Sequence, residues 1–319
     1  MSTAIERAPS SQRATGTEGD PSRKRRRSTG LREGRAAWVL ALPFCLLFLV
    51  FTLWPVAQSL FMSFTDTRAK DLRTPFSVEV IGVENYTRAF SDETFLRAIR
   101  NTAYFVLVGV PLTILLALAA AVALDRGITK FRSVFRLGFY TPVITSIVAV
   151  AVVWQYLLRD EFGLINTVLG WFGIDGPNWL GDANWSMPGL IMMAAWRNFG
   201  TGMIIFLAGL QGVPWALHEA ASIDGANTWQ RFLHITLPLL RPVILFVSVT
   251  TMIGYLQFFE EPFVMTNGGP LDSTLSMSLY TYRQFGFGNY GYAAALSYII
   301  FVAVAVITAL QFRALRENT

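Results

Sequence analysis

Residues 219–238 read EAASIDGANTWQRFLHITLP and lie between two long apolar stretches of the chain. Pro214, just before this stretch, suits the first turn of a helix that runs through Trp215, Leu217, Glu219, Ala220, Ala221 and Ile223, and the Asp224-Gly225 pair is suited to end it. Thr228 is suited to cap a second helix with apolar residues at helical spacing. The stretch therefore predicts two short helices joined by a turn, within a loop over residues 211–241 on an aqueous face of a membrane protein.

The composition favours a membrane protein over a soluble one. Of the 319 residues, 53% are apolar and only 15% are charged, against about 25% charged in a typical soluble domain. The single cysteine, Cys45, excludes a disulfide within the chain. The two histidines, His218 and His234, are too few and too far apart to predict a metal site.

Six apolar segments are long enough to cross a bilayer, whose core of about 30 Å requires roughly 20 apolar residues in a helix. They are residues 36–64, 99–124, 137–158, 187–210, 242–259 and 292–312. Proline occurs in several of them, which membrane helices tolerate when neighbouring groups satisfy the freed carbonyls. The predicted class is an all-α membrane protein with six transmembrane helices.

The distribution of lysine and arginine predicts the orientation. Nine of these residues lie in residues 1–35 and four in 125–136, whereas 159–186 and 260–291 hold one each. Basic connections remain in the cytoplasm, so the last two face outward. An even number of spans then places both termini, and the loop 211–241, in the cytoplasm.

The basic N-terminal tail is expected to be disordered because it is rich in Ser, Arg, Gly and Thr. Its basic cluster, residues 23–27, fixes the topology; contact with anionic membrane lipid is the alternative role. The first span is too long for a cleavable signal and five further spans follow it.

Motifs for built-in chemistry are absent from the sequence. It contains no G-x-x-x-x-G-K-[ST] loop for ATP, no H-E-x-x-H and no serine nucleophile elbow. We therefore expect no catalytic residue, no metal and no cofactor in this chain, and no nucleic-acid partner. If the protein moves a solute uphill, another protein must supply the energy.

One charge lies deep in a predicted span: Arg197, in AAWRNFG. A charge at this depth costs about 2.5–3.5 kcal/mol on insertion scales, so it is expected to face the bundle interior or a wet cavity. Aromatic faces beside hydrogen-bonding groups suit a sugar ring. The candidate substrate pathway is Arg197, Asn198, Tyr255 and Phe258. The alternative is an internal pair between Arg197 and Glu260 or Glu261, with the aromatic residues as packing.

The loop resembles the EAA motif of permease subunits of binding-protein-dependent ATP-binding-cassette (ABC) importers. The family pattern is Glu-Ala-Ala, glycine four residues on, then Ile-x-Leu-Pro, and this chain has Glu219-Ala220-Ala221, Gly225 and Ile235-Thr236-Leu237-Pro238. TNGGPLDSTLSMSLYTYRQF, residues 266–285, resembles the outward connection after the fifth span in the carbohydrate branch. So do WPVAQSLFMSF (54–64) and ENYTRAF (84–90). The resemblance covers residues 36–312.

The resemblance implies a MetI-like permease fold in the cytoplasmic membrane of a bacterium. It also implies four kinds of partner: a second, homologous permease, two ATPase subunits that carry ATP and Mg, an extracytoplasmic solute-binding protein or lipoprotein, and membrane lipid. The implied ATPase-coupling residues are Glu219, Ala220, Ala221, Asp224, Gly225, Ile235, Leu237 and Pro238. The expected organisation is a tail (1–35), a first span with an outer loop (36–98), a core (99–312) and a cytoplasmic C-terminus (313–319).

Import of a carbohydrate (a sugar, an oligosaccharide, a polyol or a glycerophosphate-like compound) is the favoured function. The first alternative is an importer of the same fold for an amino acid, peptide or anion, which the NGGP-containing connection argues against. The second is a secondary transporter driven by an ion gradient, which the coupling motif and the lack of buried acids disfavour. The third is a membrane enzyme, for which the sequence shows no catalytic constellation.

Overall fold

The computed structural model describes residues 38–73, 78–127 and 131–316, so the predicted tail at 1–35 lies outside the described residues. Two compact units divide the chain, Met1–Gln58 and Ser59–Thr319. In the described residues the only β structure is one isolated bridge between Thr65 and Val80. The predicted all-α class is therefore confirmed.

The described part of the first unit belongs to a single helix. This helix runs over Trp38–Ser63, has 26 residues and is apolar enough to cross a membrane. It includes a π-helical turn, η1 (Leu49–Leu53), and continues as α2 (Trp54–Ser63). The apolar side chains of η1 are exposed, which suits contact with lipid.

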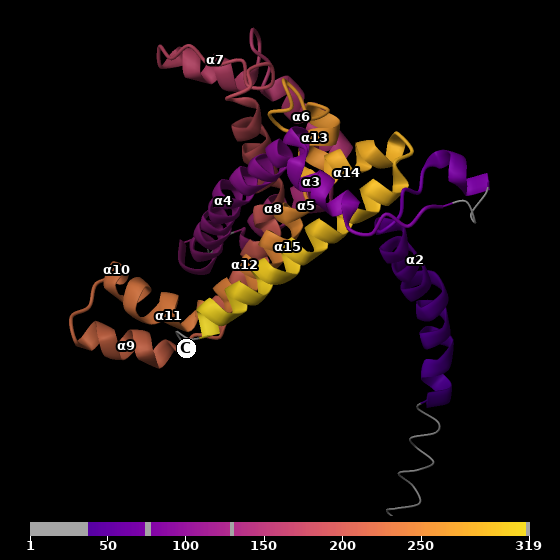
Figure 1. Ribbon diagram of the computed structural model, residues 1–319. Helices are drawn as coiled ribbons and strands as arrows, with labels where there is room; N and C mark the ends of the chain where they lie inside the picture. Colours follow the sequence, from indigo (N-terminus) through magenta and orange to yellow (C-terminus); the bar gives the residue numbers. More distant parts are fainter. Residues whose placement is uncertain (1–37, 74–77, 128–130, 317–319) are drawn as a thin grey trace, which may run out of the picture. The chain divides into compact units, whose positions relative to one another are not determined.

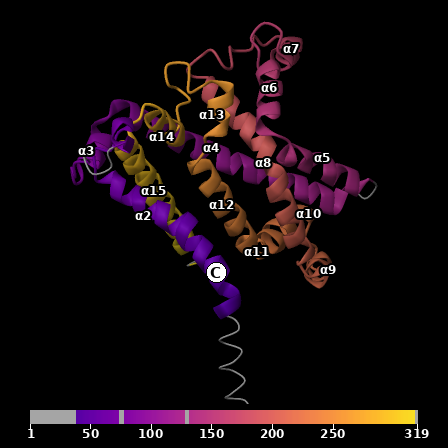
Figure 2. The ribbon, with the colours of Figure 1, turned by 90° about the vertical axis from the view of Figure 1, so that its right-hand side faces the viewer.

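The second unit contains the remaining elements. In chain order they are η2 (Ala69–Arg73), α3 (Glu84–Ser91), α4 (Glu93–Val122), η3 (Ala123–Gly127), α5 (Arg132–Ile144), α6 (Ile147–Leu157), α7 (Leu164–Trp171), α8 (Ser186–Gln211), α9 (Trp215–Ile223), α10 (Thr228–Arg231), η4 (Phe232–Thr236), α11 (Leu237–Leu239), α12 (Arg241–Leu256), α13 (Glu260–Met265), α14 (Met277–Gly286) and α15 (Tyr290–Arg316). The short helices α9 and α10 lie at one end of this unit, and α13 and α14 lie at the other (Figures 1 and 2).

The centre of the second unit is the crossing of α8 with its neighbours, and glycine makes the close approach possible. A Cβ added at Gly202 of α8 would lie 2.9 Å from the Cβ of Ala117 in α4. A Cβ added at Gly200 would lie 2.4 Å from the carbonyl oxygen of Phe139 in α5. In lipid, close backbone approach of this kind replaces the hydrophobic drive as the source of helix association.

Four helices match predicted spans without a break: Trp38–Ser63, Glu93–Asp125, Ser186–Gln211 and Tyr290–Arg313. Two further candidates are bent helix pairs, each of which is either one broken span or a re-entrant loop. Thr228–Leu239 and Arg241–Leu256 meet at 66°, close to the break expected from Pro238 and Pro242. The described residues therefore contain four candidate spans, or six, the predicted number, if each bent pair is counted as one span.

The third predicted span, 137–158, differs from a single straight helix. Arg132–Ile144 and Ile147–Leu157 meet at 100°. Thr145 is extended, with φ −79° and ψ 144°, and its hydroxyl donates to the carbonyl of Thr141. Threonine hydroxyls that bond the preceding turn compete with the helical ladder and bend it. An apolar count cannot detect this break, because both halves are apolar.

Several helices also extend beyond the predicted limits. Helix α4, which corresponds to the second predicted span, begins at Glu93 rather than at residue 99. The reason is that the side chain of Asp92 accepts hydrogen bonds from the N–H groups of Thr94 and Phe95. The last helix continues to Arg316. Polar turns at helix ends lie outside the apolar core of a membrane and therefore outside a prediction based on hydropathy.

Candidate functional site

The first helix of the loop, α9, ends in a motif that satisfies its own carbonyl groups. The N–H of Gly225 donates to the carbonyl of Ser222 at 3.2 Å, and the N–H of Ala226 donates to that of Ala221 at 2.9 Å. Gly225 has φ +83°, the left-handed conformation that glycine adopts without strain. This is the Schellman pattern, and it confirms the turn that Asp224-Gly225 predicted.

The second helix is capped by Asn227 and not, as predicted, by Thr228. The Asn227 side chain accepts from the N–H of Gln230, and the Gln230 side chain accepts from the N–H of Asn227, each at 2.8 Å. This is a reciprocal capping box. Thr228 is the first helical residue. Both residue types suit a cap, and Gln230 lies three positions after Asn227, so this spacing was the available signal.

A π-helical segment, η4, follows the short α10 and was not predicted. It covers Phe232–Thr236 and leads into α11, where Pro238 lies near the start. The buried Thr236 lies at the end of η4. Single π-helical turns often occur at functional sites. The local sequence carries no distinct signal for the extra residue in this turn.

The predicted coupling residues divide into an outer set and an inner set. Glu219, Ala220, Asp224 and Gly225 are exposed, and Ala221 is half-buried. The second helix contributes Ile235, Leu237 and Pro238, which are half-buried and thus support the hairpin more than they present a surface. A hollow of about 370 Å³ lies between the two arms, lined by residues that include Ala221, Gly225 and Ile235.

The loop also exposes large apolar side chains that sequence reasoning did not select. Trp215 and Ile223, at the two ends of α9, are 75% and 83% exposed. Trp229 is exposed on the second arm. Exposed apolar groups on an ordered surface mark contact sites for lipid or protein. The available signal was the presence of bulky apolar residues in a segment too short to cross a membrane.

A cavity of about 500 Å³ lies between α8, α12 and α13. All four predicted pathway residues line it, so the structure brings together side chains from 197 to 258 that the sequence separates. The lining residues are Arg197, Asn198, Thr201, Gly202, Ile205, Val247, Thr250, Thr251, Gly254, Tyr255, Gln257, Phe258, Phe259, Glu260 and Glu261. The volume lies in the range of small-molecule sites, about 300–1,000 Å³.

The two predicted aromatic residues of this cavity are mainly packing groups. Phe258 is 4% exposed and stacks on Phe105, with ring centroids 3.9 Å apart and planes at 4°. Tyr255 is 5% exposed, and its hydroxyl lies 2.8 Å from that of Thr113. The ring faces are therefore occupied by protein, and little aromatic surface remains for a sugar.

Exposed polar groups supply the accessible surface of the cavity instead. Thr201 of α8 and Thr250, Gln257 and Glu260 on the fifth span and the start of α13 are exposed. Sequence reasoning missed the threonines. The signal was present as helical spacing: Thr201 lies four residues after Arg197, and Gly254 lies four residues after Thr250, so each pair shares a helix face.

The charges around the cavity are close together but unpaired. The Nε of Arg197 is buried and has no hydrogen-bond partner. The ion pairs in the described part of the chain are Arg132–Asp125 and Arg283–Asp272, so the alternative pairing of Arg197 with either glutamate is not formed. Burial raises the pKa of Glu261, and a backbone hydrogen bond and the charge of Arg197 act in the opposite direction.

Comparison with known proteins agrees with this geometry. The family model for the binding-protein-dependent transport system inner membrane component matches residues 109–315. The lactose transport system permease protein LacF of Rhizobium radiobacter is 38% identical over 287 residues, which cover 88% of this chain and 94% of LacF. The arabinooligosaccharides transport system permease protein AraP of Bacillus subtilis is 34% identical, covering 87% of this chain and 88% of AraP.

A solved structure gives the same result. It is the bacterial alginate ABC transporter in complex with an alginate pentasaccharide-bound periplasmic protein, and one of its chains matches with a TM-score of 0.76 and 28% identity. The match covers 91% of this chain and 97% of that one. The helical pair of this chain has the family's EAA motif, and a polar cavity lies between the two long helices that the pair connects. The chain belongs to the binding-protein-dependent inner-membrane components, the permease subunits of ABC importers.

Proposed function

We propose that this chain is a permease subunit through which a carbohydrate enters a bacterial cell across the cytoplasmic membrane. It works with a second permease, two ATPase subunits that bind ATP and Mg, and an extracytoplasmic solute-binding protein. Relatives named for lactose and arabinooligosaccharide transport support the carbohydrate cargo. The alginate transporter, solved with a periplasmic protein, supports the solute-binding partner.

One observation carries the proposal: the two main helices that line the cavity are joined by the coupling loop. Residue 211 ends α8 and residue 241 begins α12, so both arms of the loop continue directly into cavity walls. A displacement of α9 by the ATPases therefore moves both walls. The 66° bend at the start of α12 is where the change of direction is absorbed.

The chemistry of the cavity suits a polyhydroxylated cargo. Its exposed hydroxyl, amide and carboxylate groups come from Thr201, Thr250, Gln257 and Glu260. Sugar hydroxyls both donate and accept hydrogen bonds, so a ring of mixed donors and acceptors can replace their hydration. Arg197, on the same face of α8 as Thr201, supplies further donors.

A second candidate cargo is a zwitterion such as an amino acid. The cavity holds a guanidinium and two carboxyl groups that are not paired with each other. Such a site could engage a carboxylate at Arg197 and an ammonium group at Glu260. The sugar-named relatives favour the carbohydrate, and the two cargo classes are distinguished by the same experiment.

The test is uptake into proteoliposomes that contain the complete transporter with its solute-binding protein. We expect a labelled oligosaccharide panel to be taken up only with ATP inside and the binding protein outside. Uptake of amino acids but not sugars would replace the cargo assignment with the second candidate. Uptake driven by a proton gradient without ATP would overturn the proposed function altogether.

A further inference from the structure

Helix α7 presents a strip of large apolar side chains on its surface. Leu164, Val168 and Trp171 are exposed and lie four and three residues apart, so they share one side of the helix. Phe162 and Phe172, just before and just after the helix, are exposed as well. Trp171 and Phe172 are each 76% exposed, which is high for aromatic residues in a folded protein.

The remaining sides of α7 are of two kinds. Ile165 and Leu169 pack against the hydrophobic core of the unit. Thr167 and Gly170, three residues apart, share a further exposed side that carries no large apolar group. The exposed surface of α7 is therefore divided into an apolar strip and a small, weakly polar strip. This division is expected of a helix that lies at a boundary between lipid and water.

A cluster of hydrogen bonds around Asn166 holds α7 in place. The Asn166 amide donates to the carbonyls of Asp160 and Pro177, each at 3.1 Å. The side-chain oxygen of Asn166 accepts from the indole N–H of Trp179 at 2.6 Å. Trp179 is buried in the same hydrophobic core. Because α7 is bound to the connections on both sides of it, its apolar strip is part of an ordered surface.

Helix α7 lies at the level where the exposed apolar surface of α6 ends. Val152 and Tyr156 of α6 are exposed and lie four residues apart, on one side of that helix. The guanidinium of Arg159 lies over the Tyr156 ring at 5.1 Å. Tyrosine and arginine are typical of the interface between a membrane and water. The next residue, Asp160, is the one whose carbonyl binds Asn166 of α7, so α7 lies at this interface.

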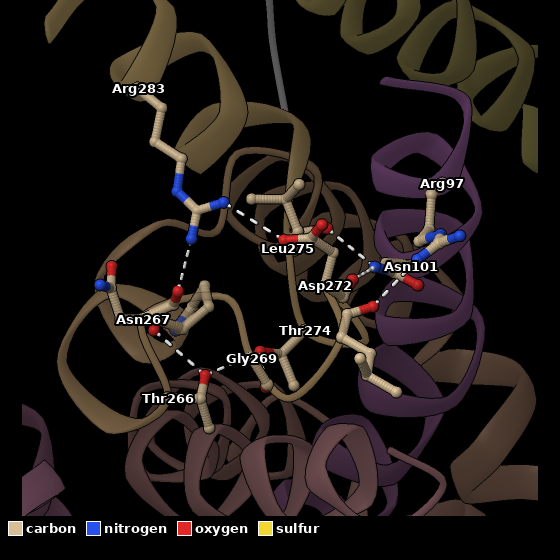
Figure 3. A network of polar contacts seen from close by, with 11 residues as sticks. Arg97, Asn101, Thr266, Asn267, Gly269, Asp272, Thr274, Leu275 and Arg283 are labelled. Carbon is tan, nitrogen blue, oxygen red and sulfur yellow. Dashed lines mark hydrogen bonds and ion pairs between the residues drawn. The ribbon is translucent and has the colours of Figure 1, made fainter. Parts of the chain in front are cut away.

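The distribution of charge distinguishes α7 from the segment 266–275 at the same end of the unit. Both α7 and α13 lie at the end opposite α9 and α10 (Figures 1 and 2). The segment 266–275 is bound into a polar network by Arg97 and Arg283, groups that suit contact with water (Figure 3). No charged residue occurs between Glu161 and Asp175. An uncharged strip with tryptophan, phenylalanine and leucine suits the headgroup region of a bilayer.

We propose that α7 is an interfacial anchor, which lies along the surface of the bilayer and buries Leu164, Val168 and Trp171 among lipid chains. The chain belongs to a family of inner-membrane components, and the proposed function makes the leaflet in question the outer one. Asn166 ties α7 to the connection that leads into α8, a wall of the cavity. The anchor thus fixes the start of that wall at the membrane surface.

The test measures the surroundings of a spin label on each exposed side of α7. Cys45, the single cysteine, is first removed in Cys45→Ser, and the partner subunits are used without accessible cysteines. Val168→Cys places the label on the apolar strip, and Thr167→Cys is the matched control on the other exposed side. The complete transporter is studied in nanodiscs, with and without its solute-binding protein. Electron paramagnetic resonance measures the accessibility of the label to oxygen, which concentrates in lipid, and to a nickel chelate, which stays in water.

We expect the ratio of oxygen to nickel accessibility to be at least about threefold higher for Val168→Cys than for Thr167→Cys, with and without the solute-binding protein. Equal ratios would overturn the lipid contact. Protection of the Val168→Cys label from both reagents would show that protein covers the strip, and would overturn it too. Protection that requires the solute-binding protein would assign the strip to that partner instead. Leu164→Cys, on the same side, replaces Val168→Cys if the latter does not assemble.

The measurement requires no cargo, so it separates this inference from the proposed function. If the unaltered transporter imports a cargo with ATP while the Val168→Cys label lies in water, only the anchor fails. If the label lies in lipid while the unaltered transporter imports nothing with ATP and the solute-binding protein, the proposed function fails and the anchor is retained.

Discussion

The hydroxyl of Tyr280 in α14 donates a hydrogen bond to the carboxylate of Asp92, 188 positions earlier in the chain. The same carboxylate accepts from Tyr292 of α15 at 2.9 Å and from the first N–H groups of α4. One acidic side chain thus joins the starts of two spans to α14. Arg88 of α3 lies over the Tyr292 ring at 4.3 Å and adds a fourth element.

Removal of this carboxylate should destabilise the subunit. Asp92→Ala deletes a helix cap and leaves two tyrosine hydroxyls without their acceptor, which together should cost about 2–4 kcal/mol. Thermal unfolding in detergent should show a clearly lower Tm. Asp182→Ala is the control, since Asp182 accepts only a local bond from the N–H of Asn184 in an exposed loop. A Tm for Asp92→Ala equal to that of the control would contradict this role.

The same group predicts an acid dependence. Burial alone would raise the pKa of Asp92, but hydrogen bonds from Tyr280, Tyr292 and two backbone N–H groups outweigh it and hold the pKa below the usual 3.8. The carboxylate therefore contributes its full stability above pH 3.8 and loses it as the pH falls through the lowered value. The Tm difference between the unaltered protein and Asp92→Asn should be constant near neutrality and shrink only below that pH.

The Tyr280 hydroxyl stays protonated, and therefore remains a hydrogen-bond donor, over the whole pH range of this experiment. Burial, with the adjacent Asp92 carboxylate, raises its pKa to about 12. A Tm difference that shrank already between pH 5 and 7 would show that another group controls the acid response.

A bulky residue on the coupling helix should uncouple the ATPases without unfolding the spans. Ala220 is exposed on α9, so tryptophan there is tolerated by the subunit but obstructs a fitted cleft. Ala220→Trp should reduce co-purification of the ATPase subunits and stop uptake, with Tm unchanged. Ala183→Trp makes the same change at an exposed alanine in the α7–α8 connection and should leave both intact. Normal uptake by Ala220→Trp would contradict a coupling role for α9.

The unpaired guanidinium of Arg197 should be used by cargo. Arg197→Leu removes donors that face the cavity, and a hydrogen bond to a charged group contributes about 1.5–3 kcal/mol. The expected result is a KM for uptake that is higher by tenfold or more, with complex assembly unchanged. Arg197→Lys retains the charge, so its KM for uptake should lie between that of Arg197→Leu and that of the unaltered transporter. An Arg197→Leu transporter with normal kinetics would mean that the residue takes no part in transport.

The crossing of α5 over α8 should tolerate no side chain at Gly200. A Cβ there would lie 2.4 Å from the Phe139 carbonyl oxygen, so Gly200→Ala must displace backbone and should cost about 1–3 kcal/mol. Gly138→Ala, in α5, has nothing within 4 Å of the new Cβ and should be neutral or stabilising. Equal Tm values for the two variants would show that the crossing is looser than described.

Local chemistry decided which parts of the fold were predictable from sequence. The turn at Asp224-Gly225 was predictable because a positive φ selects glycine within a few residues. The number of spans was predictable because each must be apolar over about 20 residues. The bend at Thr145 was not, since it changes the direction of the axis and not the polarity of the segment.

The sequence was enough to predict which residues line the cavity, but not which groups those residues contact. A deep charge had to face a cavity, and Arg197 does so. The partner of a residue, however, depends on distant elements. Phe258 was expected to offer its ring to a ligand, but Phe105, on another span, covers that ring. The pairing of Arg197 with a glutamate likewise depended on side-chain positions that helical spacing does not fix.

The Schellman ending at Gly225 and the reciprocal cap of Asn227 with Gln230 give each N–H group from Asp224 to Asn227 a hydrogen-bond partner within the hairpin itself. Because that shape is already ordered, little conformational entropy is lost on docking. A stiff hairpin transmits a displacement in either direction. If the proposed function holds, a change at the cavity is expected to reach the partner ATPases through this hairpin, by the same route along which ATP hydrolysis would act on the cavity.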